Sequence, residues 1–375
     1  MAVGFPVKAD YATGDVLTAA NMNDFAGTLN LFQSTLYPAG RNKIINGDFN
    51  VNQRAFTTTT TSGAYGFDRF QMLASDGTST YSAQTFTTGA APVAGYEATN
   101  FARLVSTGQT LTTARTLLTQ KIESVRSFAG QNVVVSFWAK ASTGTPSVAA
   151  GFQQHFGTGG SPSANVETPA GKTAITTSWA RYEFNVALPS ISGKTIGTAA
   201  TTDFLAIQLI TSAGSTYNTI SSSLGIQSAT IDFWGLQVEA ASTGSTASPF
   251  QTATGTIQGE LAACQRYYIR YNTEASDYGN FSSSAWALSA TTAYGIFALP
   301  VEMRRAATAV EFASLAFVDS GDNIFGYTLV TLNTNATKNK SAMISGTISG
   351  ATANRPGRIC ANNTSAGYIA FTAEL

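Results

Sequence analysis

Four acidic side chains lie in segments whose residue pattern predicts β-strands. They are Asp48, Asp68, Asp232 and Glu239. Two carboxylates at a suitable separation are sufficient for glycoside hydrolysis, because one protonates the leaving group while the other activates water or attacks the sugar. A sequence does not give that separation. We therefore expect each of them to accept structural hydrogen bonds or to bind calcium, with Asp48 the candidate calcium ligand, and we expect no catalytic residue.

Other catalytic arrangements have little support. His155 is the only histidine and lies beside a glycine- and serine-rich loop without a G-x-S-x-G elbow, so no nucleophilic triad is expected. The chain has no H-E-x-x-H, P-loop or G-x-G-x-x-G segment, which argues against metal hydrolysis and nucleotide chemistry. Cys264 and Cys360 are expected to be free, buried thiols. Residues 319–323 resemble half of a calcium loop but lack the closing glutamate, so a turn is expected there.

Aromatic side chains give a better indication of a ligand. Sugar rings stack on aromatic faces, and the abundant Asn, Gln and Thr side chains can bind hydroxyl groups. Trp138 and Trp234 lie in strongly patterned strands and are expected in the core. Four aromatic residues near polar loops are the candidate ligand-binding residues: Tyr65, Tyr217, Tyr278 and Trp286.

Composition limits the class of protein. The 375 residues include 21 basic and 21 acidic side chains, so no basic surface for nucleic acid is expected. No run approaches the 18 or more apolar residues of a membrane span, and the first residues lack the pattern of a signal peptide. Charged residues make up only 11% of a chain rich in Thr, Ser and Gly. We expect a soluble β protein that is made in a cytoplasm and needs no cofactor.

The elements that must position these side chains begin with a helix near the N-terminus. Apolar residues recur there at alternating spacings of three and four, with Thr18 as N-cap and Pro38 as stop. They are Met22, Phe25, Leu29, Phe32 and Leu36. Packing against the following domain is one explanation of such a stripe. We favour self-association into a three-stranded coiled coil, because bulky Phe at core positions needs a wide seam.

Residues 41–271 are predicted to form an antiparallel jelly-roll β-sandwich. Its first strand is expected within residues 42–54, after a turn at 46–48, and its clearest strand at 131–141. Further strands are expected at 67–73, 80–85, 101–105, 116–122, 180–186, 204–210, 226–238 and 263–271. The last of these could instead make a short helical turn. Residues 57–61 and 157–163 are low in complexity and are expected to be surface loops or disordered.

Residues 272–375 are predicted to form a smaller C-terminal β domain. Its strands are expected at 283–288, 292–299, 308–313, 324–332, 341–348 and 368–373. No helix-length apolar repeat interrupts either β region, which favours antiparallel sheets over a βαβ fold.

Several separated segments together resemble tail-fibre and related structural proteins of tailed bacteriophages. The resemblance lies in residues 46–54, 65–70, 130–140, 237–239, 248–250 and 260–268. Residues 14–24 are similar to the virion-proximal start of such fibres, and residues 367–375 to their last strand.

The resemblance implies a homotrimeric virion protein, located at the tail rather than the head. Residues 1–40 would attach to other virion proteins and trimerise. The sandwich would be like a carbohydrate-binding module, and residues 272–375 would form the outer tip. The implied partner is host-surface polysaccharide or lipopolysaccharide, without nucleic acid or membrane insertion. Two alternatives stay open: a polysaccharide-degrading tail protein, and a capsid-decorating head fibre without a receptor role.

Overall fold

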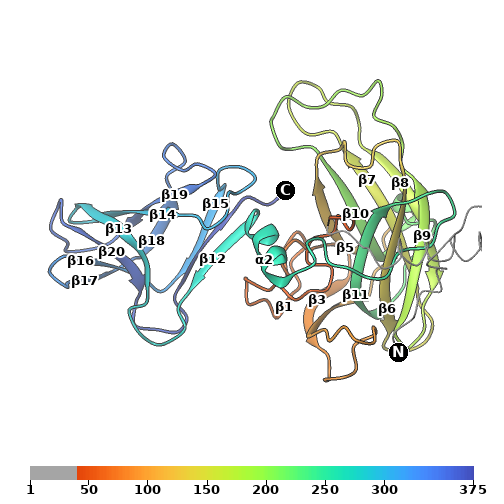
Figure 1. Ribbon diagram of the computed structural model, residues 1–375, viewed down its shortest axis with the longest axis horizontal. Coiled ribbons are helices and arrows are strands. Elements are labelled where there is room, and N and C mark those ends of the chain that lie inside the picture. Colours follow the sequence, from red (N-terminus) through yellow and green to blue (C-terminus); the bar gives the residue numbers. More distant parts are fainter. Residues whose placement is uncertain (1–39) are drawn as a thin grey trace, which may run out of the picture.

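The computed structural model describes residues 40–375 and shows a mainly β protein. Its strands pair antiparallel and form four sheets in that part of the chain. Two sheets make an N-terminal sandwich, two make a smaller C-terminal body, and helix α2 (Ile257–Gln265) lies between them (Figure 1). The predicted fold class, a jelly-roll sandwich followed by a smaller β domain, is confirmed. The predicted N-terminal helix, with Thr18 as N-cap and Pro38 as stop, lies outside the described residues.

The N-terminal sandwich consists of a six-stranded and a five-stranded sheet. The six-stranded sheet contains, in spatial order, β1 (Thr58–Thr59), β3 (Thr78–Thr85), β4 (Asn100–Thr107), β11 (Ala229–Ala240), β6 (Asn132–Ala141) and β9 (Ala180–Ala187). The five-stranded sheet contains β2 (Gln71–Ser75), β5 (Arg115–Glu123), β10 (Phe204–Ala213), β7 (Ser147–His155) and β8 (Val166–Ala174).

Strand β6 lies inside the six-stranded sheet, as its sequence predicts. Its residues are buried without interruption from Val133 to Ala139, where β-branched and aromatic side chains favour the extended backbone. Trp138 is paired with Trp234 of β11, and their ring centroids are 5.4 Å apart. Both tryptophans belong to the main hydrophobic core, so the prediction that they serve packing is confirmed.

The strand predicted within residues 42–54 is absent, and that prediction is wrong. The segment is a largely buried series of turns in which Asn46 and Phe49 have positive φ angles of 60° and 57°. The Asn46 side chain takes both backbone groups of Val51: its Oδ1 accepts from the amide at 2.8 Å and its Nδ2 donates to the carbonyl at 2.8 Å. Side-chain amides here replace the hydrogen bonds of a neighbouring strand. The alternating polar residues that suggested a strand in residues 42–54 instead serve these side-chain hydrogen bonds.

Three other features of the sandwich differ from prediction. The sequence gives no prediction for β7 or β8. Strand β8 contains Pro169, which is tolerated because this strand lies at a sheet edge. The threonine run at 57–61 is not wholly a loop, since Thr58–Thr59 pair with β3 as a short edge strand.

Helix α2 replaces the first part of the strand predicted at 263–271, which is a second correction. Its N-cap Thr256 accepts a hydrogen bond from the Gly259 amide at 3.1 Å. The helical turn that the sequence left as an alternative therefore forms, and it buries Glu260 and Cys264. No helix within residues 40–375 is long and apolar enough to cross a membrane.

The C-terminal body also has two sheets. The three-stranded sheet contains β12 (Tyr268–Asn272), β21 (Tyr368–Thr372) and β15 (Ala309–Ala313). The seven-stranded sheet contains, in order, β17 (Ile324–Gly326), β16 (Leu315–Asp319), β20 (Pro356–Ala361), β13 (Asn280–Ser289), β14 (Thr292–Ala298), β19 (Ser341–Thr347) and β18 (Leu329–Leu332). Strands β16 and β20 are not predicted from the sequence, and the strand predicted at 324–332 is divided into β17 and β18. A separate core that includes Phe297, Phe317 and Phe371 fills the space between the two sheets.

Buried charges join the two bodies. Glu374, just after β21, forms ion pairs with Arg69 and Arg54 of the sandwich. The Arg69 side chain is 1% exposed and that of Glu374 is 8% exposed. Nearby, Lys121 Nζ donates a hydrogen bond to the Leu375 carbonyl oxygen at 2.5 Å. Because an unpaired charge at such depth is costly, these pairs fix one relative position of the two bodies.

Replacing Glu374 by alanine should destabilise the protein strongly. The substitution leaves the Arg69 guanidinium buried without its carboxylate, which costs about 3–5 kcal/mol. Urea unfolding followed by tryptophan fluorescence measures the change. The matched control is Glu302→Ala, because Glu302 pairs with Lys340 at 3.4 Å with side chains 48% and 74% exposed. The control should change the unfolding free energy by less than about 1 kcal/mol. If Glu374→Ala and Glu302→Ala lowered the unfolding free energy equally, the conclusion that buried charges join the two bodies would be wrong.

Candidate functional site

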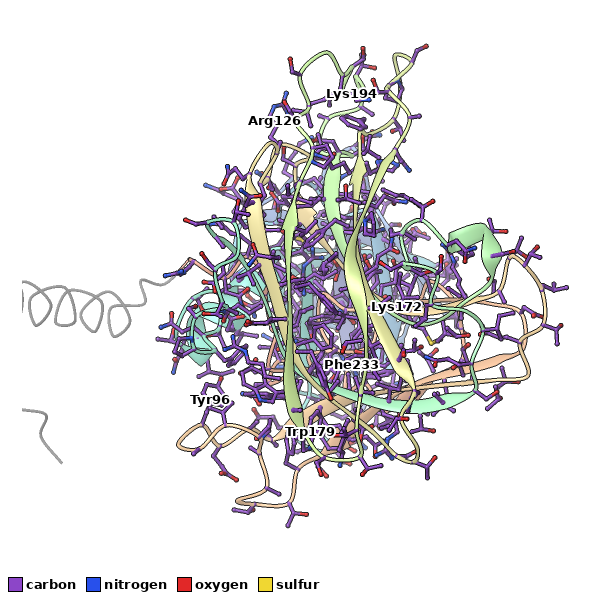
Figure 2. All side chains as sticks on the ribbon, turned by 90° about the vertical axis from the view of Figure 1, so that its right-hand side faces the viewer. Tyr96, Arg126, Lys172, Trp179, Lys194 and Phe233 are labelled. Carbon is purple, nitrogen blue, oxygen red and sulfur yellow. The ribbon has the colours of Figure 1, made fainter. Side chains whose placement is uncertain are left out.

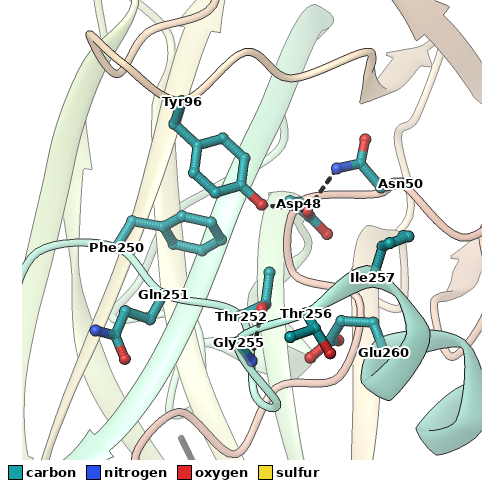
Figure 3. A pocket seen from close by; sticks show the side chains of 10 residues that line it. All are labelled: Asp48, Asn50, Tyr96, Phe250, Gln251, Thr252, Gly255, Thr256, Ile257 and Glu260. Carbon is teal, nitrogen blue, oxygen red and sulfur yellow. Dashed lines mark hydrogen bonds between the residues drawn. The ribbon is translucent and has the colours of Figure 1, made fainter. Parts of the chain in front are cut away.

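A cavity of about 360 Å³ lies where four segments distant in sequence meet. The segments are the turn after Asn46, the loop between β3 and β4, the connection from β11 to α2, and the first turn of α2. The lining residues are Asp48, Asn50, Tyr96, Phe250, Gln251, Thr252, Gly255, Thr256, Ile257 and Glu260 (Figure 3). Tyr96 lies near one end of the sandwich, and the loops that carry Arg126 and Lys194 lie at the other (Figure 2).

Asp48 is the most distinctive group in this pocket. The residue is 2% exposed, and its Oδ2 accepts hydrogen bonds from Asn50 Nδ2 and the Tyr96 hydroxyl, each at 2.6 Å. Its Oδ1 is buried and has no hydrogen-bond partner among the described residues. Burying a carboxylate oxygen without a hydrogen-bond donor costs free energy. A ligand that donates a hydrogen bond to Asp48 Oδ1 would recover that cost.

The rings of Tyr96 and Phe250 line the same pocket as the Asp48 carboxylate. Tyr96 and Phe250 meet edge to face with centroids 5.6 Å apart, and the buried Trp234 supports both rings. Burial and the neighbouring Asp48 carboxylate raise the pKa of Tyr96 well above its ordinary value. The phenol therefore remains protonated and continues to donate to Asp48.

Glu260 also lines the pocket, but its carboxylate is fully used. Its Oε1 accepts from the Thr254 amide and hydroxyl at 2.7 and 2.8 Å, and its Oε2 accepts from the Asn46 amide at 2.6 Å. Glu260 thus fastens α2 to the turn that carries Asp48. What the pocket leaves for a ligand is one carboxylate oxygen, aromatic surface, and the amide and hydroxyl groups of Gln251 and Thr252.

Calcium at Asp48 stays a prediction, and within residues 40–375 Asp48 belongs to no group of three or more acidic, histidine or cysteine side chains that could hold a metal ion. Asp48 Oδ2 already accepts hydrogen bonds from an amide and a phenol, so this oxygen serves as a hydrogen-bond acceptor.

The other predicted carboxylates are held in separate ion pairs. Asp232 on β11 is bound by Arg103 at 2.6 Å, and Glu239, on the same strand, pairs with Arg41. Asp68 accepts from the Gln53 backbone amide at 2.7 Å and side-chain amide at 2.8 Å. None of the three lines the pocket around Asp48.

The four predicted ligand aromatics lie at four different places. Tyr217 ends the short 3₁₀ helix η1 (Ser215–Tyr217), and Tyr278 packs on the apolar cluster around Ala316. Trp286 lies on β13, half-buried. The Tyr65 hydroxyl donates to the Leu375 carbonyl oxygen at 3.0 Å, at the junction of the two bodies. The structure therefore brings none of them together.

Tyr96 and Phe250 were not among the four aromatic residues selected from the sequence as ligand-binding candidates. Phe250 belongs to the 248–250 segment that carries the resemblance, and Tyr96 follows a run of small residues. Neither segment has a strand or helix pattern that would place its side chain opposite Asp48. Only the paired turns around Asn46 and Thr256 bring them together.

The remaining reactive side chains have structural surroundings. His155 stacks on Phe204 with centroids 4.4 Å apart, and its Nδ1 accepts a hydrogen bond from the Gly157 amide. Cys264 and Cys360 are free and buried, as the sequence predicts.

Comparison with known proteins gives structural likenesses alone. No protein-family profile matches the chain, and no curated protein matches its sequence. Among solved structures, the enzymatically active domain of tailspike protein 4 of bacteriophage CBA120 is 12% identical with a TM-score of 0.30. That match covers 54% of this chain but only 22% of the tailspike chain.

Two carbohydrate-binding modules are matched over nearly their whole length. The family 11 module of Clostridium thermocellum, in complex with a β-1,3-1,4-mixed-linked tetrasaccharide, is 10% identical with a TM-score of 0.30, over 50% of this chain and 97% of that one. TmCBM61, in complex with β-1,4-galactotriose, is 10% identical with a TM-score of 0.27, over 54% and 99%. TM-scores this low carry no functional assignment for this chain.

Asp68 should make stability depend on pH near neutrality. Burial raises its pKa to about 6, against the opposing effects of Arg54 and Gln53. Because the folded-state pKa exceeds the unfolded value, this group stabilises the fold below the unfolded pKa, and the contribution is lost as pH rises through 6. Between pH 7.5 and pH 5, wild type should gain roughly 1 kcal/mol relative to Asp68→Asn.

Urea unfolding of both proteins at the two pH values measures this difference. The amide variant cancels contributions from other titrating groups, because those groups are common to both proteins. A gain of wild type over the variant at the higher pH would show that the ion pair with Arg54 keeps Asp68 charged.

Proposed function

We propose that this chain is a non-catalytic, glycan-binding structural protein of a tailed bacteriophage, a tail fibre that attaches to the particle and binds host-surface glycan. The observation that carries the glycan-binding part is the pocket around Asp48, in which a buried carboxylate oxygen without a donor lies beside two aromatic rings. The virion part rests on the sequence segments that resemble tail-fibre proteins.

A neutral sugar residue matches the chemistry of this pocket. Sugar hydroxyls are donors that Asp48 Oδ1 lacks, and the apolar face of a pyranose packs on aromatic rings such as Tyr96 and Phe250. Gln251 and Thr252 offer both donors and acceptors to the remaining hydroxyls. The pocket holds one such residue at a polysaccharide end or branch, since its volume of about 360 Å³ is small.

The proposed trimer, formed by residues 1–40, would compensate for a weak single site. Three linked sites raise the apparent affinity for a repeating polysaccharide without further contacts. Light scattering of the full chain, and of protein released from particles, measures the oligomeric state. A monomer in both samples would exclude the trimer, and gold-labelled antibody on the head of the particle would favour a head fibre over a tail fibre.

A polysaccharide-degrading enzyme is the second candidate, because two carboxylates, Asp48 and Glu260, line the same pocket. Glycoside hydrolysis needs one carboxyl group to donate a proton and the other to act as base or nucleophile. The three hydrogen bonds that Glu260 accepts occupy both of its carboxylate oxygens in holding α2 to the turn after Asn46. We therefore place binding before hydrolysis.

Asp48→Asn should weaken glycan binding at least about tenfold, because it removes a charged acceptor whose hydrogen bonds contribute about 1.5–3 kcal/mol. The probe is an array of neutral bacterial O-antigen oligosaccharides, followed by calorimetry on the best-bound one. Tyr96→Ala, at a half-buried position, is a second variant with the same expected loss. Asp277→Asn and Tyr294→Ala, outside the pocket, are the matched controls.

Thermal unfolding of each variant separates loss of binding from loss of folding. Unchanged affinity in folded Asp48→Asn protein would overturn the proposed site. Release of reducing ends by wild type but not by Asp48→Asn would instead establish the hydrolase.

A further inference from the structure

A second cleft, of about 470 Å³, lies between the sandwich and the C-terminal body. The sandwich contributes Arg54, Gly63, Ala64 and Tyr65. The three-stranded sheet contributes Tyr268 and Arg270 from β12, Tyr368 and Thr372 from β21, and Glu311 from β15. Of the four aromatic residues that the sequence offered as ligand-binding candidates, Tyr65 lines this cleft, and the pocket around Asp48 shares none of the residues of the cleft.

Strand register places the polar residues of this sheet on one face. Arg270 and Glu311 both pair with Ala370, so the three residues form one row across the sheet. The alternate residues, such as Ile269 and Phe371, point into the core of the C-terminal body. Arg270 and Glu311 are thus separated by two strand spacings, roughly 9.5 Å, with the small Ala370 between them.

Among residues 40–375, Arg270 is a positioned cation that has no acidic side chain as counter-ion. Its guanidinium lies 3.8 Å from the Tyr368 ring centroid, and its Nη1 donates to the Arg54 carbonyl oxygen at 2.6 Å. Its Nε is buried without an acceptor, and no carboxylate within the described residues comes within 4.0 Å of it. A guanidinium held in a fixed plane is suited to binding a carboxylate.

Neighbouring charges do not neutralise Arg270. Arg54 lies 3.6 Å from the Tyr268 ring centroid and is itself paired with Glu374 at 3.2 Å and Asp68 at 3.5 Å. Glu311 is exposed, and its Oε2 accepts from the Tyr268 hydroxyl at 3.0 Å. The cleft therefore has a free positive charge at Arg270 and a negative charge on the far side of Ala370.

We propose that this cleft binds a carboxylate-bearing sugar residue, with its carboxylate on Arg270 and its ring beside Tyr65 and Tyr368, the two half-buried tyrosines of the cleft. Glu311 directs the acidic group toward Arg270 by repelling it from the other end of the row. The Tyr368 and Thr372 hydroxyls supply hydrogen bonds to the sugar hydroxyls. This second site goes beyond the neutral-sugar pocket and does not depend on it.

Calorimetry with trigalacturonic acid as the acidic probe, and with its methyl ester as the neutral one, tests the assignment on the full chain. Wild type should bind the acid more tightly than the ester, and salt should weaken the acid alone. Arg270→Gln should weaken the acid at least about tenfold. Glu311→Gln should tighten it about two- to fourfold by removing a repulsion at roughly 10 Å, and should leave the ester unchanged.

Two controls keep this site apart from the pocket around Asp48. Arg305→Gln removes an exposed arginine outside the cleft and should leave acid binding unchanged. Asp48→Asn should also leave acid binding unchanged, so failure of the first site does not affect this test. Equal binding of acid and ester by wild type, or an unchanged affinity in Glu311→Gln, would overturn the proposal even if Arg270→Gln failed to fold.

Discussion

The hydrogen bonds around Asn46 hold the N-terminal half of the molecule together. The Asn46 amide donates to Glu260 of α2, its side chain closes the turn onto Val51, and its Nδ2 also reaches the Asp68 carbonyl oxygen. Beside it, Gly47 lies so close to the Leu236 carbonyl oxygen that a Cβ would overlap that atom. One buried turn thus connects β11 to the helix that precedes the C-terminal body, and its backbone path decides where Asp48 points.

The junction between the two bodies also depends on buried polar groups that need partners. Arginines that enter an interior need carboxylates and acceptors, and Arg69 obtains them from Glu374 and the Lys121 carbonyl oxygen. The Arg69 guanidinium also lies 3.3 Å from the ring centroid of Tyr267, which directly precedes β12. Such directional contacts are satisfied in one orientation of the two bodies. The cleft beside Arg270 depends on that orientation.

The sequence was informative where structure is decided locally. Residues 131–141 combine β-branched and aromatic side chains, and they form β6 as predicted. The prediction for 42–54 was wrong because asparagine side chains make hydrogen bonds that a neighbouring strand would otherwise make, and the partner of Asn42 Nδ2 lies 209 residues away. Strand β8 was missed since an edge strand tolerates Pro169 and needs little apolar alternation. The residue pattern of a short segment reveals neither the distant partners nor the position of a strand at the sheet edge.

Both candidate sites depend on contacts that no local pattern contains. Tyr96 lies 48 residues from Asp48 along the chain, yet their side chains share a hydrogen bond. Arg270 and Glu311 become neighbours only because β21 lies between β12 and β15. Each site is also built at a joint between elements, where turns and caps leave a few polar groups unpaired. The strands determine where those joints fall, and the unpaired groups determine which ligand chemistry they admit.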